Sequence, residues 1–286
     1  MTAQYSQLSI APMMAWTDRH FRYLMRLIMP DVRLYTEMVT TGALLHSDPK
    51  RYLAFSQEEH PIALQLGGYD PSQLAICAKM GEDFGYDEIN INIGCPSDKV
   101  NSGRFGACLM KEPALVAECV AQMQQSVQIP VTVKTRIGID EFDDYAFLQK
   151  FIETVQQAPC QTFIIHARKA WLNGLSPKQN REIPPLQYDR VYQLKKDYPH
   201  LNIIINGGIK TIEQAHEHLQ HVDGVMIGRS AYENPFYWMQ NTDLSRKEII
   251  MQYLDYMNQQ AQNGHHFWPM ARHLLNVFNG EPGARA

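Results

Sequence analysis

The sequence predicts an α/β fold, a closed barrel of eight parallel strands that alternate with helices, followed by a small helical region. Short β-rich runs recur eight times between residue 8 and residue 230, and each run is followed by a helical pattern. Repeated strand–helix units of this kind form a (β/α)8, or TIM, barrel. The runs cover residues 8–13, 33–41, 61–68, 87–94, 130–138, 161–169, 202–209 and 224–230.

The alternative arrangement is a doubly wound open sheet. Such a sheet usually carries a G-x-G-x-x-G turn after its first strand, where the glycines approach a bound dinucleotide. Residues 11–20 read APMMAWTDRH and contain no glycine. The sequence therefore favours the barrel.

The expected helices have recognisable starts. A capping side chain, a proline in the first turn or an acidic first turn stabilises the free N–H groups at a helix N-terminus. Each such signal separates a β-rich run from the helix that follows it. The signals stand at Asp70-Pro71, Glu112-Pro113, residues 140–145 (DEFDDY) and Thr211.

Residues 241–286 change to a helical pattern without further strands. Ser245 and Glu248 form a capping box for one helix, and a second helix is expected over residues 270–278. We therefore expect a barrel domain over residues 1–240 and a helical domain over residues 241–286. The helical pattern stops part-way into a bundle, so this second domain is expected to be truncated.

Composition excludes several classes of protein. Lys+Arg 26 against Asp+Glu 30 gives a formal net charge of -4, so a nucleic-acid partner must be argued from a local patch. The five cysteines are odd in number and lack C-x-x-C spacing, which favours a reducing compartment and predicts no metal site. The N-terminus has no signal-peptide pattern, and no apolar run approaches the about 20 residues that a membrane helix needs. A cytoplasmic protein is expected.

Polar side chains and glycines stand at the predicted C-terminal ends of all eight strands, where barrel enzymes build their sites. The loops after the last two strands are rich in small residues, which suits a phosphate group. The residues at these ends are Pro12 and Met13, Glu37, Gln65, Asn92 and Cys95, Lys134 and Arg136, His166 and Arg168, Asn206 to Gly208, and Gly228 with Arg229.

These motifs resemble those of the tRNA-dihydrouridine synthases. The resemblance lies in APM, ALQLGG, NIGCPSDKV, VKTRIG, IIHAR, INGGI and IGR, which end successive strands, and it extends from about residue 8 to the end of the chain. The stretch HARKAWLNGLSPKQNREIPPL resembles the bacterial A subfamily, which reduces uridines at positions 20 and 20a of the tRNA D-loop.

The resemblance implies an FMN enzyme that takes electrons from NADPH and acts on tRNA. It assigns the barrel domain to flavin binding and catalysis and the helical domain to tRNA. Cys95 would be the proton donor. The flavin contacts would be Ala11, Pro12, Met13, Gln65, Lys134, His166, Asn206, Gly207, Gly208, Gly228 and Arg229.

The residue types suit that chemistry. Reduction of the uridine C5=C6 bond needs a hydride on one carbon and a proton on the other, and a thiol with a pKa of about 8.5 is a neutral acid near pH 7. Gly103 and Gly106 would let the loop that carries Cys95 close over the base. Asn92 would hydrogen-bond the pyrimidine edge. The other four cysteines lie in helical or apolar contexts and are expected to be inert.

The loop after the sixth strand is the expected RNA contact. It is long for a connection in a barrel, and it interleaves basic side chains with Trp171, which suits phosphates and an unpaired base. We expect Arg168, Lys178 and Arg181 to contact tRNA.

Two other functions are open at the level of sequence. A flavin barrel that reduces a free pyrimidine or another small molecule would share the same strand ends. A non-catalytic RNA-binding or chaperone role would use the barrel as a scaffold and bind no flavin. The sequence does not fix an oligomeric state, and a monomer is the working expectation.

Overall fold

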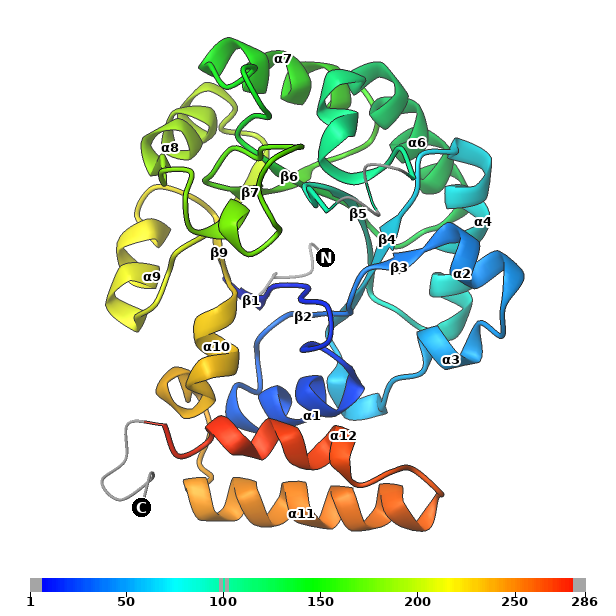
Figure 1. Ribbon diagram of the computed structural model, residues 1–286, viewed down its shortest axis with the longest axis vertical. Helices are drawn as coiled ribbons and strands as arrows, with labels where there is room; N and C mark the ends of the chain where they lie inside the picture. The colour runs from blue at the N-terminus through cyan, green and yellow to red at the C-terminus, as the bar shows by residue number, and fades with distance from the viewer. Residues whose placement is uncertain (1–6, 98–99, 101–102, 280–286) are drawn as a thin grey trace.

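A closed barrel of parallel strands forms the centre of the protein (Figure 1). The structure is a computed structural model that describes residues 7–97, 100 and 103–279. The strands follow the order β1-β9-β8-β7-β6-β5-β4-β2, and every pairing is parallel, which confirms the predicted fold class. Their bounds are β1 Leu8–Ile10, β2 Leu34–Tyr35, β3 Val39–Thr40, β4 Ile62–Gly67, β5 Glu88–Ile93, β6 Val131–Arg136, β7 Thr162–His166, β8 Asn202–Asn206 and β9 Gly224–Ile227.

The barrel closes between β1 and β2. The backbone N–H of Ile10 donates to the Arg33 carbonyl at 2.9 Å, and the Arg33 N–H donates to the Leu8 carbonyl at 3.1 Å. These bonds leave neither strand as a free edge, so the C-terminal ends of the strands form one continuous rim.

The prediction of one strand over residues 33–41 is wrong in its middle. The run is divided into β2 and β3, which both pair with β4. Between them, the hydroxyl of Thr36 accepts a hydrogen bond from the Gln65 N–H at 3.0 Å in place of a ladder bond. Glu37 lies in this break, and its carboxylate accepts the N–H of Ala15.

Helices surround the barrel, and the predicted starts are present. Asp70, Asp144 and Thr211 cap α4, α7 and α9, and Ser245 forms the expected capping box with Glu248 at α11. The α-helices are α1 Arg19–Ile28, α2 Thr41–His46, α3 Lys50–Leu53, α4 Pro71–Phe84, α6 Pro113–Ser126, α7 Tyr145–Val155, α8 Tyr188–Asp197, α9 Ile212–Leu219, α10 Arg229–Glu233, α11 Arg246–Gln262 and α12 Trp268–Ala271. The 3-10 helices are η1 Gln57–Glu59, η2 Gly106–Lys111, η3 Gln179–Arg181, η4 Pro235–Trp238 and η5 Arg272–Asn276.

Alternation along β5 separates two environments. Ile89, Ile91 and Ile93 belong to the large core between strands and helices. Successive side chains of a strand point to opposite faces, so Glu88, Asn90 and Asn92 point into the barrel. A small apolar cluster fills the rest of the interior, made of Ala11, Tyr35, Ala63, Ile164, Ile204 and Met226 with Met13 packed against it.

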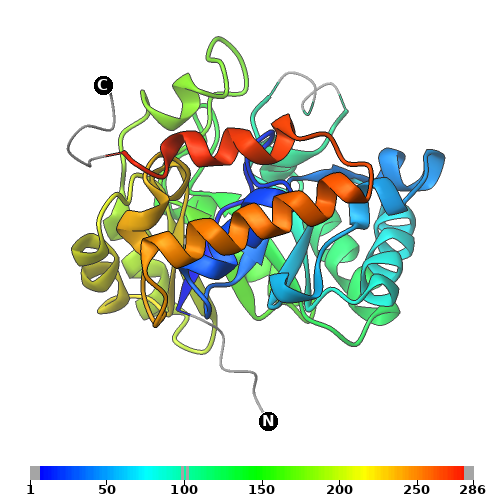
Figure 2. The ribbon, with the colours of Figure 1, turned by 90° about the horizontal axis from the view of Figure 1, so that it is seen from below.

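The two C-terminal helices lie beside α1 on the outside of the barrel (Figures 1 and 2). Tyr256 of α11 stacks on Tyr23 with ring centroids 3.9 Å apart, and its hydroxyl lies 2.8 Å from Nδ1 of His20. The predicted second helix begins at Trp268 and continues as the 3-10 helix η5. Its His273 lies 2.9 Å from the carboxylate of Asp18.

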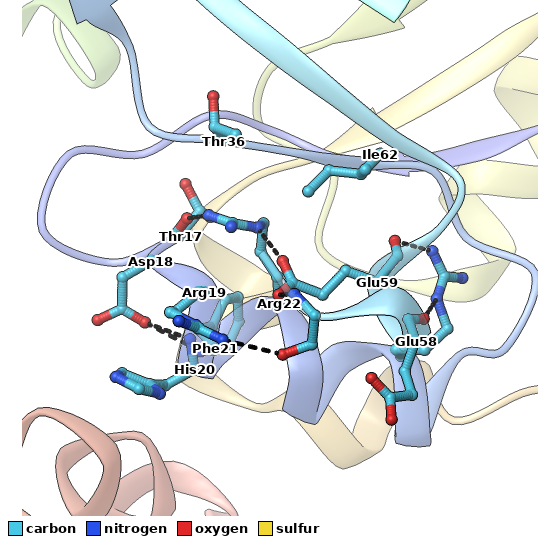
Figure 3. A network of polar contacts seen from close by, with 12 residues as sticks. Thr17, Asp18, Arg19, His20, Phe21, Arg22, Thr36, Glu58, Glu59 and Ile62 are labelled. Carbon is cyan, nitrogen blue, oxygen red and sulfur yellow. Dashed lines mark hydrogen bonds and ion pairs between the residues drawn. The ribbon is translucent and has the colours of Figure 1, made fainter. Parts of the chain in front are cut away.

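A polar network fixes α1 to the rest of the barrel wall (Figure 3). Asp18 caps α1 by accepting the N–H groups of His20 and Phe21. The buried Arg22 pairs with the buried Glu59 at 2.6 Å and donates to the Thr17 carbonyl at 2.8 Å. The segment between β1 and α1 is therefore fixed by two residues. Arg22 bonds to the Thr17 carbonyl, and Asp18 caps the first turn of α1.

Candidate active site

Cys95 lies just after the C-terminal end of β5, in a loop whose backbone is fixed by hydrogen bonds to the Asn92 side chain and to Ala107. The Asn92 side-chain oxygen accepts the N–H groups of Gly94 at 3.0 Å and Cys95 at 2.9 Å. The Cys95 carbonyl accepts the N–H of Ala107 at 3.0 Å. The thiol is half-buried and lies 3.5 Å from the Ser97 hydroxyl. Residues 98 and 99 of the NIGCPSDKV motif lie outside the described residues.

The side chains of Gln65 and Asn92 bond to each other below this loop. The Asn92 amide nitrogen donates to the Gln65 oxygen at 2.9 Å, and the Gln65 nitrogen donates to Asn90 at 2.8 Å. Asn92 was predicted to contact a pyrimidine, and in this arrangement it also fixes the backbone of the Cys95 loop. Its nitrogen keeps one N–H for a ligand.

Lys134 is held between β8 and the Cys95 loop. Its ammonium group donates to the Asn206 oxygen at 3.1 Å, and the Asn206 nitrogen donates to the Met226 carbonyl at 2.8 Å. Burial and, to a smaller extent, the nearby Arg136 lower the pKa of Lys134 to about 7, and Cys95 acts in the opposite direction. An anion placed at the rim would therefore favour the charged lysine.

Arg136 joins two loops of the rim, the Cys95 loop after β5 and the loop between β7 and α8. Its Nε donates to the Gly94 carbonyl at 2.8 Å, and its Nη1 donates to the carbonyls of Lys169 and Asn180, both at 3.1 Å. Burial lowers the pKa of Arg136 to about 10. Sequence reasoning placed Arg136 on the rim without a role. Its position two residues after Lys134 on β6 was the available signal, because that spacing puts both side chains on one face.

The His166 ring lies directly against the backbone of the glycines that follow β8. Gly207 and Gly208 have φ of +116° and +72°, and a Cβ at Gly207 would lie 3.2 Å from the His166 ring. Burial holds the pKa of His166 well below its ordinary value, so the ring is neutral at pH 7. Its Nδ1 is buried and makes no hydrogen bond within the described residues. An acceptor or donor from a ligand would satisfy this atom.

The start of the chain completes the rim. Ala11 is buried in the barrel interior, and its N–H donates to the Ile227 carbonyl at 2.8 Å. Pro12 is half-buried, and the Met13 N–H donates to the Thr17 hydroxyl at 2.9 Å. These two hydrogen bonds fix the turn that follows β1. The turn lies beside the end of β9, which Gly228 follows directly.

Arginines hold the long loop between β7 and α8. Arg168 donates to the Glu182 and Pro184 carbonyls, and Arg229 pairs with the Glu182 carboxylate at 2.7 Å. Lys178 and Arg181 are exposed on the same loop, at η3. Gly228 precedes α10 with open space where a Cβ would stand. Glu182 was not singled out from the sequence, because its partner is 47 residues away.

The other cysteines lie away from this arrangement. Cys77, Cys119 and Cys160 are buried, and burial raises their thiol pKa values to about 11, 12 and 12. Cys108 is half-buried, and burial also raises its pKa. Protonated buried thiols are poor nucleophiles and poor ligands, which agrees with the expectation that these residues are inert.

The described ranges 7–97, 100 and 103–279 contain no helix with both the length and the apolar character needed to cross a bilayer. In the same ranges, no three His, Cys, Asp or Glu side chains come close enough to hold a metal ion.

Fold and rim together define a class of protein, a (β/α)8 barrel whose rim carries a thiol, a buried lysine, a neutral histidine and two glycines of positive φ. Residues 9–286 match the model of the dihydrouridine synthase (Dus) family. The chain belongs to the dihydrouridine synthase family, which is a family of oxidoreductases.

Curated relatives are similar over almost the whole chain. The chain is 60% identical to the tRNA-dihydrouridine(20/20a) synthase of Shewanella oneidensis, over 97% of this chain and 85% of that protein. It is 58% identical to the protein of the same name from Synechocystis, over 97% and 86%. It is 56% identical to that of Vibrio vulnificus, over 98% and 88%.

Proposed function

We propose that this oxidoreductase reduces the C5=C6 bond of uridine in the tRNA D-loop, at positions 20 and 20a, to give 5,6-dihydrouridine. The family assignment and the names of the similar proteins support this activity. The observation that carries the proposal is the half-buried Cys95 thiol at the end of β5, on a loop fixed by Asn92 and Arg136 and close enough to Lys134 to act on its charge.

FMN is the cofactor that we assign to the rim, with NADPH as its reductant. The residues present suit it, because His166 offers an unsatisfied Nδ1, Gly207 and Gly208 expose backbone, and Lys134 supplies positive charge. When bound, FMN would supply a hydride to one carbon of the base. The assigned contacts are Ala11, Pro12, Met13, Gln65, Lys134, His166, Asn206, Gly207, Gly208, Gly228 and Arg229.

Cys95 would deliver the proton to the second carbon, from the face opposite the cofactor. The C5=C6 π bond then becomes two C–H bonds, and the thiolate that is left takes a proton from solvent. Arg136 and Lys134 stabilise that thiolate by charge, since both lie close enough to Cys95 to affect its electrostatics. Asn92 would keep the loop in register while the base is in place.

The tRNA would approach over the loop between β7 and α8. Lys178 and Arg181 are exposed there and would contact phosphates, while Arg168 would fix the loop from below. We assign catalysis and flavin binding to residues 1–240 and tRNA binding to the helical residues 241–286. A monomer acting in the cytoplasm without a metal ion is the simplest assembly for this function.

The test is absorbance followed by activity on two substrates. The purified protein should be yellow with bound flavin, and with NADPH it should form dihydrouridine in unmodified tRNA far faster than in free uridine. Equal activity on free uridine or another free pyrimidine would favour the small-molecule alternative. A colourless protein that binds tRNA without reducing it would favour the non-catalytic alternative.

A further inference from the structure

A row of polar side chains crosses the barrel interior below Cys95. It begins at Glu88, which is 1% exposed, and passes through Thr132 and Asn90 before it reaches Gln65 and Asn92. The strand register explains why these residues meet. Gln65, Asn90 and Thr132 occupy one row of β4, β5 and β6, because Gln65 pairs with Asn90 and Asn90 pairs with Thr132.

Each bond of the row has a defined donor and acceptor, and all run in one direction. The Thr132 hydroxyl donates to Glu88 at 2.6 Å, and Asn90 donates to Thr132 at 2.8 Å. Gln65 donates to Asn90 at 2.8 Å, and Asn92 donates to Gln65 at 2.9 Å. The row ends where the Asn92 oxygen accepts two backbone N–H groups of the Cys95 loop.

Both ends of the row impose this direction independently. Burial raises the pKa of Glu88, whereas the Arg33 guanidinium, 3.4 Å from its other oxygen, favours the carboxylate, whose oxygens only accept hydrogen bonds. Oε1 of Glu88, which accepts the Thr132 hydroxyl, also accepts the Tyr35 hydroxyl at 2.7 Å. At the far end, the N–H groups of Gly94 and Cys95 can only donate. An amide that turned over anywhere between would face a donor with a donor or an acceptor with an acceptor.

We propose that Asn90 and Thr132 are positioning residues for the proposed reaction. The row that they complete fixes which end of the Gln65 amide faces the rim and which backbone conformation the Cys95 loop adopts. Neither residue would touch the substrate or the cofactor. This inference rests on the proposed function for its kinetic consequence, whereas its effect on Cys95 is independent of tRNA.

Two isosteric substitutions break the row. Thr132→Val keeps the shape of the side chain but removes the hydroxyl that joins Asn90 to Glu88. In Asn90→Asp, an ionised carboxylate can still accept from Gln65 but cannot donate to Thr132, so the Thr132 hydroxyl either faces an acceptor or turns away from Glu88 to donate to the new carboxylate. Thr132→Ser keeps the hydroxyl and is the conservative variant. Thr162→Val is the matched control, because Thr162 is a buried strand threonine of β7 whose hydroxyl accepts from Asn202 at 3.1 Å outside the row.

The experiment measures two quantities in the purified flavoprotein. The first is the rate of Cys95 alkylation by iodoacetamide across a pH series, resolved by mass spectrometry. The second is kcat and KM for dihydrouridine formation in unmodified tRNA. Thr132→Val and Asn90→Asp should alkylate several-fold faster at Cys95 and lose about tenfold in kcat at an unchanged KM for tRNA. Thr132→Ser and Thr162→Val should behave as the unsubstituted protein.

Wild-type alkylation and kcat in both row-breaking variants would overturn the inference. So would equal losses in Thr162→Val, since they would show general loosening of the barrel. If Asn90→Asp does not fold, the pair Thr132→Val and Thr132→Ser decides the question alone. If the unsubstituted protein forms no dihydrouridine, the proposed function fails, and the alkylation rates still decide this inference.

Discussion

Two buried polar networks lie on opposite sides of the barrel wall, and they differ in what they hold. Inside, the row from Glu88 to Asn92 consists mainly of neutral amides and ends on the backbone of Cys95. Outside, Arg22 and Glu59 form a charged pair that fixes α1 (Figure 3). Asp18 joins that helix to η5 through His273. The inner network sets the backbone geometry of the loop that carries Cys95, whereas the outer network sets the position of a helix.

The difference predicts separable consequences of mutation. Loss of an inner bond should change chemistry more than stability, because the strands that carry it stay paired. Loss of an outer charge should change stability more than chemistry, because an ion is left buried without its partner.

The largest expected effect on stability follows from Arg22→Met. Glu59 is fully buried, so this substitution should lower the free energy of unfolding by about 3 kcal/mol. Chemical denaturation measures the loss. The matched control is Arg19→Met on the same helix, where the half-buried arginine donates to the Ser56 hydroxyl at 3.2 Å, and it should cost less than about 1 kcal/mol. Equal losses of unfolding free energy in the two variants would show that the buried Arg22–Glu59 pair stabilises the fold no more than the Arg19 contact does.

A pH-dependent effect follows from His20, which bonds to Tyr256 of α11. Burial lowers the pKa of His20 to about 4, so below the unfolded value of 6.5 the unfolded chain binds more protons than the folded one. Stability should therefore fall between about pH 6.5 and pH 4, by about 2 kcal/mol at pH 5 from this residue. Asp18, Arg19, His265 and His273 also act on this histidine.

The His20 contribution is isolated by difference. Denaturation of the unsubstituted protein and of His20→Gln should be compared at pH 7 and pH 5, and the substituted protein should lose less stability on acidification. The same loss in both proteins would assign the acid sensitivity to other groups.

The smallest effect is expected for the exposed cations of the loop between β7 and α8. Lys178→Ala and Arg181→Ala should each weaken tRNA binding and lower the slope of log Kd against log salt by about 1, since each removes one phosphate contact. Lys150→Ala, an exposed lysine of α7, is the control and should leave the slope unchanged. An unchanged slope in all three variants would place the RNA elsewhere.

The strand and helix pattern was predictable because it depends on local chemistry. Alternation in EININI and the caps at Asp70 and Thr211 are properties of a few neighbouring residues, and the structure confirms them. The division between β2 and β3 was not predictable, since β-rich residues continue through the break and only the Thr36 hydroxyl bond to β4 replaces the ladder.

The rim residues were predictable as a group, whereas their connections were not. Strand ends are visible in the sequence, so Cys95, Lys134 and His166 could be named in advance. The bonds of Arg136 to two neighbouring loops and of Asn90 to Thr132 depend on register between strands, which no single sequence pattern encodes. The polar half of EININI was the one available sign that the barrel interior carries a hydrogen-bonded row.

The central claim is that Cys95 donates the proton from the loop above β5. The most direct measurement compares dihydrouridine formed in unmodified tRNA by the unsubstituted protein, Cys95→Ala and the control Cys108→Ala, with flavin content and NADPH oxidation followed in parallel. Cys95→Ala should keep its flavin and its NADPH oxidation and lose about 100-fold or more in product formation, while Cys108→Ala should be unaffected. Product formation by Cys95→Ala at a near-normal rate would contradict the account.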